Sequence, residues 1–204
     1  MEVLVVTGGI GSGKSEVCKI LKDLYGCGTY NADERVKRLY DVHPSLLSDI
    51  ETLLGESMRD EEGGFVPSRL SSRIFRDKRL LEKVEDLVFP ALIEDFRCWA
   101  EDYHEDRFVV FESATILEKP QFKGFGDKII IVDSLIETRL ERACMRDSAS
   151  RDSIYSRMLN QKLMNSISNG EAIPAADAVI YNAGTLSDLR LNVIRAVKKL
   201  YDNL

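Results

Sequence analysis

A glycine-rich segment near the N-terminus has the residue types and spacing needed to bind phosphate. Gly8, Gly13, Lys14 and Ser15 fill the pattern Gly-x-x-x-x-Gly-Lys-Ser, directly after the aliphatic run 3–7. Glycines let backbone N–H groups approach phosphate oxygens, and the start of a following helix adds a positive dipole end. A lysine here can contact the β- and γ-phosphates, and the serine hydroxyl can ligate Mg²⁺. The segment therefore predicts a phosphate-binding loop for a nucleoside triphosphate.

Two other interpretations of this segment fit less well. An ordinary glycine-rich turn would not need the Lys-Ser ending or the preceding buried strand. The dinucleotide-binding fingerprint, started at Gly9 and Gly11, would need a third glycine where the chain has Lys14.

Two acidic residues follow predicted strands and are candidates for chemistry beside the phosphates. Asp33 comes shortly after a short strand near 29–30, where a carboxylate can accept a proton from a substrate hydroxyl. Aspartate is equally suited to cap a helix at this position, so the residue pattern leaves both roles open. Glu112 ends the apolar strand 108–111, where it can hold the water shell of Mg²⁺ or simply be a solvated strand end.

A basic stripe lies further along the chain. Arg139, Arg142 and Arg146 recur at spacings of three and four residues, which predicts that they share one helix face. Glu141 and Asp147 are interleaved with them, so a salt-bridged solvent face is one interpretation. We favour a lid whose guanidinium groups close over the ATP phosphates and stabilise the transferring phosphoryl group.

Strands and helices alternate along the rest of the chain, which favours an α/β fold with a parallel sheet covered on both faces. The predicted strands are 3–7, about 29–30, 108–111, 128–133 and 178–181, and the clearest helices are about 13–24, 151–165 and 186–201. From about residue 34 to 105 the pattern is helical, with a long stretch 79–102 that we expect to be interrupted or bent at Pro90. This block is too long for a simple crossover, so it predicts either an inserted substrate-binding subdomain or a structural helical cap.

The bulk composition limits the class of protein. The chain has 204 residues and a formal net charge of −6, which argues against a general nucleic-acid binder but not against an anionic small substrate. The four cysteines show no metal-binding or disulfide spacing. We find no signal peptide and no apolar run long enough to span a bilayer, and we expect a cytoplasmic protein that binds neither membranes nor nucleic acid. The sequence does not define an oligomeric state.

Taken together, the motifs resemble the dephospho-coenzyme A kinase family over almost the whole chain. The resemblance rests on Thr7 to Ser15, Ala32-Asp33, the stretch 139–146, Gln161 and the late segment 176–184. It implies a P-loop kinase with a five-stranded parallel sheet covered by helices on both faces. The implied parts are a core of about 1–33, 106–138 and 175–204, a helical substrate-binding insertion of about 34–105, and a helical lid of about 139–174.

The resemblance also implies an activity and residue roles. The activity is transfer of the ATP γ-phosphate to the ribose 3′-hydroxyl of dephospho-coenzyme A, with Mg²⁺, in the last step of coenzyme A synthesis. Asp33 matches the family's catalytic base, and the other expected catalytic residues are Lys14, Arg142 and Arg146. Ser15 and Glu112 are expected to serve the metal. The expected nucleotide-binding residues are Gly8, Gly9, Ile10, Gly11, Ser12, Gly13, Lys14, Ser15, Glu16, Arg142 and Asn182.

Several positions depart from the family pattern, and four of them are single substitutions. Asn31 stands where an aspartate is usual, Glu16 for a threonine, Phe89 for a histidine and Arg139 for a glutamine. The extra carboxylate of Glu16 is unfavourable near phosphate unless it points away. The other changes concern the acceptor side more than the ATP side.

Two rival functions fit parts of the pattern. A kinase for another small metabolite, such as a nucleoside or nucleotide, would use the helical block to bind a base. A nucleotide-switched binding protein would hydrolyse ATP or GTP slowly, but the chain has no guanine-reading Asn-Lys-x-Asp. The arginine stripe and Asp33 favour transfer over switching.

Overall fold

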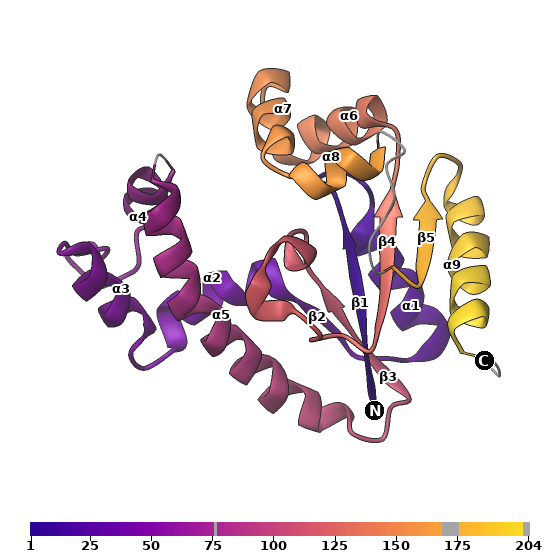
Figure 1. Ribbon diagram of the computed structural model, residues 1–204, viewed down its shortest axis with the longest axis horizontal. Coiled ribbons are helices and arrows are strands. Elements are labelled where there is room, and N and C mark those ends of the chain that lie inside the picture. The colour runs from indigo at the N-terminus through magenta and orange to yellow at the C-terminus, as the bar shows by residue number, and fades with distance from the viewer. Residues whose placement is uncertain (76, 169–175, 202–204) are drawn as a thin grey trace. The chain divides into compact units, whose positions relative to one another are not determined.

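The computed structural model describes residues 1–75, 77–168 and 176–201 (Figure 1). The chain divides into two compact units. The first consists of Met1–Asn31 with Tyr103–Leu204 and contains the sheet. The second is the helical segment Ala32–Asp102.

Five parallel strands form the sheet of the first unit, as the sequence predicts. Their order across the sheet is β2-β3-β1-β4-β5, and every neighbouring pair is parallel. The register places Val6 opposite Glu112, and Glu112 opposite Asn31, so β2 and β3 end at the same level and β1 continues to Gly8 at the same edge. The strands are β1 (Glu2–Gly8), β2 (Thr29–Asn31), β3 (Phe108–Glu112), β4 (Lys128–Asp133) and β5 (Ala178–Tyr181).

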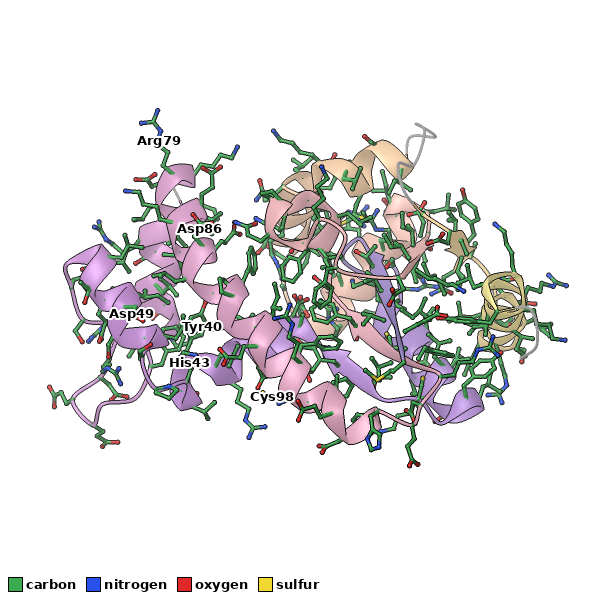
Figure 2. The ribbon with its side chains drawn as sticks, turned by 60° about the horizontal axis from the view of Figure 1, so that its bottom comes forward. Tyr40, His43, Asp49, Arg79, Asp86 and Cys98 are labelled. Carbon is green, nitrogen blue, oxygen red and sulfur yellow. The ribbon has the colours of Figure 1, made fainter. Side chains whose placement is uncertain are left out.

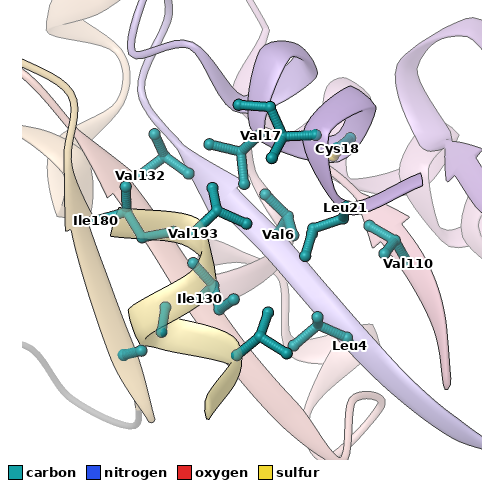
Figure 3. Packing of buried hydrophobic residues seen from close by; sticks show 14 of the residues in the cluster. Leu4, Val6, Val17, Cys18, Leu21, Val110, Ile130, Val132, Ile180 and Val193 are labelled. Atoms are coloured by element: carbon teal, nitrogen blue, oxygen red, sulfur yellow. The ribbon is translucent and has the colours of Figure 1, made fainter. Parts of the chain in front are cut away.

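One face of the sheet packs against α1 (Lys14–Tyr25) and α9 (Leu186–Leu200), and residues of the sheet and of both helices share one buried core. In Figure 3, side chains of α1 and α9 interdigitate with alternate residues of the strands. Helix α1 ends at Gly26, whose φ of 68° is a left-handed conformation that glycine adopts without strain. The labelled core residues of Figure 3 are Leu4, Val6, Val17, Cys18, Leu21, Val110, Ile130, Val132, Ile180 and Val193.

The other face of the sheet carries α8 (Lys162–Ser168), which buries Met164 and Ile167 against Ile131. Helices α6 (Ile136–Asp147) and α7 (Arg151–Leu159) bury apolar residues against each other, and Ile10 of the glycine-rich loop packs on them. The connection from β3 to β4 contains the short 3₁₀ turns η2 (Ile116–Glu118) and η3 (Pro120–Phe122). Helices therefore cover both faces, as expected for a parallel sheet.

The described residues of the second unit, 32–75 and 77–102, form four α-helices, and Figure 2 shows side chains of this unit. Within it, the ring of Tyr40 lies 4.4 Å from the ring of Phe65, and burial raises the pKa of Tyr40 to about 12. The helices are α2 (Ala32–Val42), α3 (Leu46–Leu54), α4 (Pro67–Ile74) and α5 (Lys78–Ala100), and a 3₁₀ turn, η1 (Glu101–Tyr103), follows them.

The structure contradicts two details of the predicted helices, namely an interruption at Pro90 and a single helix over 151–165. Helix α5 continues through Pro90 instead of being interrupted there, because buried residues from Val84 to Phe96 form one continuous apolar face on both sides of the proline. The helix predicted over 151–165 is two helices, α7 and α8, separated at Asn160 and Gln161, where the Gln161 side chain bonds to a distant loop. Residues 169–174 of the predicted lid lie outside the described residues.

The four cysteines are free thiols in different surroundings. Cys18 and Cys27 are buried in the core of the first unit, whereas Cys98 is exposed on α5 (Figure 2). Cys144 on α6 is half-buried. Among the helices in the described ranges, none combines the length and apolar character needed to cross a bilayer.

Candidate active site

The glycine-rich loop connects β1 to α1 and places the start of a 12-residue helix next to its glycines. Gly13 precedes the first helical residue with a φ of 98°, a conformation that L-residues rarely adopt. Lys14 opens the helix, and its Nζ lies 3.4 Å from the carbonyl oxygen of Gly9 across the loop. The predicted loop thus has the helix N-terminus, the lysine and the compact curvature that binding of a phosphate group requires.

Ser15 and Glu112, the two residues expected to serve the metal, are adjacent. The Ser15 hydroxyl donates to Glu112 Oε1 at 2.7 Å, and the Asn31 amide donates to Glu112 Oε2 at 3.3 Å. The Glu112 side chain is buried at the end of β3, so these donors help to compensate its charge. Burial and this carboxylate together raise the pKa of the neighbouring Cys18 thiol well above its usual value. The oxygen donors of Ser15 and Glu112 fit a hard cation such as Mg²⁺.

Side chains from three other segments of the first unit form hydrogen bonds with the backbone of the loop. The N–H of Ile10 donates to Gln161 Oε1 at 2.8 Å, and its carbonyl accepts from Arg139 Nε at 3.0 Å. The carbonyl of Ser12 accepts from Asn182 Nδ2 at 2.9 Å. Three segments that are distant in sequence therefore fix the loop conformation, which lowers the entropy cost of binding an anion there.

The three arginines predicted to share one helix face all lie on α6, as the spacing predicts, but they occupy three different environments. Arg139 is completely buried beneath the loop, because the first turn of α6 packs directly against Ile10. Arg142 Nη1 donates to the carbonyl of Asn182 at 3.2 Å. Arg146 is exposed and forms a two-pronged contact with Asp147, at 2.7 and 3.1 Å.

Asn182 links the loop to α6. Its side chain supports Ser12, while its carbonyl accepts from Arg142 and from the Ser134 hydroxyl, the latter at 2.8 Å. Its backbone N–H continues the pairing with Asp133 of β4 at 2.8 Å. The structure thus places two predicted nucleotide-binding residues, Arg142 and Asn182, in one network with the loop.

Asp33 is an exposed residue in the first turn of α2. The helix begins at Ala32, so Asp33 is inside the helix rather than at its cap position. It belongs to the second unit and is separated along the chain by one residue from Asn31, which ends β2. Glu16 is half-buried in the first turn of α1, immediately after Ser15.

Sequence reasoning did not predict that three residues of this site would support the loop. Gln161 contributed to the family resemblance but received no role, and Asp133 and Arg139 were not predicted to support the loop. A glutamine beyond a helix end and an acidic residue at a strand end carry no pattern that identifies their partners. Only the folded chain brings them to the loop.

The sheet order, the glycine-rich loop between β1 and α1, and the acidic residue at the end of β3 define a P-loop kinase fold. Solved structures share this fold. A protein from Thermus thermophilus aligns over 100% of this chain and 98% of its own with a TM-score of 0.79 and 24% identity. A dephospho-CoA kinase from Campylobacter jejuni aligns over 98% and 97% with a TM-score of 0.63 and 20% identity.

Sequence comparison shows to which family of P-loop kinases the chain belongs. The family model described as dephospho-CoA kinase matches residues 2–188. A dephospho-CoA kinase of Porphyromonas gingivalis is 36% identical over 183 residues, which cover 90% of this chain and 87% of that protein. One from Aquifex aeolicus is 27% identical over 204 residues, covering 100% and 98%. The chain belongs to the dephospho-CoA kinase family, which confirms the resemblance, and it is a kinase with ATP as co-substrate.

Proposed function

We propose that this chain transfers the γ-phosphoryl group of ATP to the ribose 3′-hydroxyl of dephospho-coenzyme A. The observation that carries the proposal is the Ser15–Glu112 contact at 2.7 Å beside a complete glycine-rich phosphate loop, in a chain of this family. Phosphoryl transfer needs little covalent help from the protein, so positioning and charge stabilisation account for most of the catalysis.

In this proposal the loop N–H groups and Lys14 hold the phosphates. Lys14 is half-buried, and its contact with the Gly9 carbonyl keeps the ammonium group over the loop. Arg142 and Arg146 contribute positive charge from α6 as charge develops on the transferring group. The contact of Arg142 with Asn182 supports its assignment, because that network also reaches the loop.

Asp33 is the proposed base that accepts the proton of the acceptor hydroxyl. Its support is its place two residues beyond the end of β2, since ligands of parallel sheets bind at the carboxyl ends of the strands. We assign the helical second unit to the acceptor and α6 to α8, with the connection to β5, to a lid.

Mg²⁺ is the proposed metal ion, with Ser15 and Glu112 as the residues that would hold it directly or through water. When bound, it would neutralise charge on the phosphates. Asn31 would continue to donate to Oε2 of Glu112 and so fix the orientation of the carboxylate.

We also propose a cytoplasmic location, where both ATP and reduced thiols are available. The free thiols of the four cysteines agree with a reducing compartment.

The test is a mass-spectrometric assay with ATP and dephospho-coenzyme A, beside a panel of nucleosides, nucleotides and sugars as alternative acceptors. We expect coenzyme A and ADP in equal amounts. Asp33→Asn should bind ATP normally and lose turnover by about 10²-fold or more. The control is Asp49→Asn, an exposed carboxylate in the first turn of α3 (Figure 2), which should retain turnover.

Phosphorylation of another acceptor in preference to dephospho-coenzyme A would contradict the proposed substrate. Normal turnover of Asp33→Asn would remove Asp33 from its role while leaving the substrate assignment in place.

A further inference from the structure

A fully buried arginine lies beneath the phosphate loop. Arg139 is in the first turn of α6, and its side chain has no exposed surface. Arginine is almost never buried completely unless its charge is paired and its N–H groups are bonded, because removing a guanidinium group from water is costly. A burial of this kind therefore needs an explanation in terms of its neighbours.

The loop lies directly on this residue. A Cβ added to Gly9 would overlap the Arg139 guanidinium group, and a Cβ added to Gly11 would overlap its backbone carbonyl. Two loop glycines are thus required by close approach to Arg139, in addition to their role in approaching phosphate. The contact covers both the side chain and the backbone of the arginine.

The hydrogen bonds of Ile10 show what this contact does to the loop. Arg139 Nε donates to the Ile10 carbonyl at 3.0 Å, and Gln161 accepts the Ile10 N–H at 2.8 Å. The Ser12 carbonyl is likewise directed into the protein, toward Asn182. When carbonyl groups are turned inward, the opposite side of the loop presents N–H groups, which is the polarity an anion needs.

The buried charge of Arg139 lies near an acidic side chain. Asp133 is an acidic partner of Arg139 within the described ranges, and the distance from Nη1 to Oδ1 is 3.8 Å. Burial lowers the pKa of Arg139 and Asp133 opposes that shift, and an arginine remains protonated. A guanidinium group that touches the loop backbone in a poorly solvated site contributes positive potential to the loop.

We propose that Arg139 is a positioning residue for nucleotide phosphates, which holds the Ile10 carbonyl inward and adds a fixed positive charge beneath the loop. This inference rests on the proposed binding of ATP by that loop. It concerns the binding step more than the transfer step, because Arg139 is separated from the phosphates by the loop backbone itself.

Three substitutions separate the contribution of the Arg139 charge from that of its hydrogen bond to Ile10. Arg139→Lys keeps the charge, Arg139→Gln keeps a donor of shorter reach without the charge, and Arg139→Met removes both. The control is Arg190→Met, the same chemical change at an exposed site on α9. Dissociation constants for AMP, ADP and ATP are measured by calorimetry at a temperature at which circular dichroism shows every variant folded, together with kcat and KM.

We expect Arg139→Met to weaken ATP binding by about tenfold or more, the effect of losing one charge-assisted hydrogen bond. The loss should grow from AMP to ATP, the kcat at saturating ATP should change less than KM, and Arg139→Lys should bind ATP more tightly than Arg139→Gln. Hydrogen exchange of the loop amides should accelerate in Arg139→Met and not in Arg190→Met.

A folded Arg139→Met that binds ATP within about twofold of the wild type would overturn the proposal. If this variant does not fold, the ATP affinities of Arg139→Gln and Arg139→Lys test the proposal instead. Wild-type affinity in both variants would also overturn it. A purely structural role would lower the melting temperature and leave the AMP-to-ATP gradient unchanged. If the wild-type protein does not phosphorylate dephospho-coenzyme A, the proposed substrate is wrong. The test of Arg139 remains valid in that case, because it measures only ATP affinity.

Discussion

Replacing Gln161 by leucine tests how far the rigidity of the phosphate loop depends on a side chain outside it. Gln161 is 5% exposed, and its Oε1 is the acceptor for the Ile10 N–H at 2.8 Å. Leucine has a similar volume and no acceptor. The variant therefore leaves the loop N–H without its partner while filling nearly the same space.

The size of the effect follows from the burial of that N–H group. Leaving a buried donor unsatisfied costs about 1–3 kcal/mol, and Ile10 is partly exposed, which favours the lower half of that range. If the N–H turns to solvent instead, the loop leaves its binding conformation. A cost of about 1–2 kcal/mol corresponds to a factor of about 5–30 in the population of the competent loop.

Calorimetric measurement of ATP affinity gives the readout, with loop hydrogen exchange as a second measurement. We expect Gln161→Leu to bind ATP about 5–30-fold more weakly. Gln161→Glu retains an acceptor oxygen and should keep the ligand-free loop protected from exchange. The control, Gln121→Leu, makes the same chemical change at an exposed position in η3.

A folded Gln161→Leu with wild-type ATP affinity and wild-type exchange of the Ile10 amide would refute the reasoning. It would mean that the loop keeps its conformation without this hydrogen bond. The contact between Gln161 and Ile10 would then be a consequence of packing and not a support for binding.

Three further predictions concern the metal residues, the core and acid stability. Asn31→Asp would place a second carboxylate beside Glu112 and lower stability by about 1–2 kcal/mol, and thermal melts should show a larger stabilisation by Mg²⁺ than in the wild type. Leu21→Ala, at a side chain with no exposed surface, should cost about 2–5 kcal/mol in urea unfolding, and a loss below about 1 kcal/mol would contradict the packing described for α1. Hydrogen bonds from Arg146 and Arg157 lower the pKa of Asp147 to about 2. Because that pKa lies below the unfolded value, the stabilisation is present above about pH 4 and lost as the pH falls toward 2, so the stability difference between wild type and Asp147→Asn should shrink from pH 5 to pH 3.

The sequence predicted the parts of the site whose chemistry is local. The loop from Gly8 to Ser15 is a contiguous motif, and the five strands are short apolar runs with clear ends. Glu112 could be placed next to Ser15 because parallel strands bring their carboxyl ends to one edge of the sheet.

The supports of the loop could not be predicted, because they depend on tertiary packing. The spacing of Arg139, Arg142 and Arg146 fixes their relative angles around α6 but not which of them the loop covers. The break before Gln161 depends in the same way on a partner 151 residues away along the chain. The interruption expected at Pro90 came from a local rule for proline. Tertiary packing outweighed that rule, because the buried face of α5 continues on both sides of the proline.

The unequal surroundings of the cysteines provide a ready attachment point for a spectroscopic probe. Alkylating reagents attack the thiolate, and burial raises the pKa of both Cys18 and Cys27, so these two thiols resist labelling. Cys98 is exposed on α5, in the helical unit. With Cys144 replaced by serine, a maleimide dye would report on the helical unit from one defined site, without an engineered cysteine.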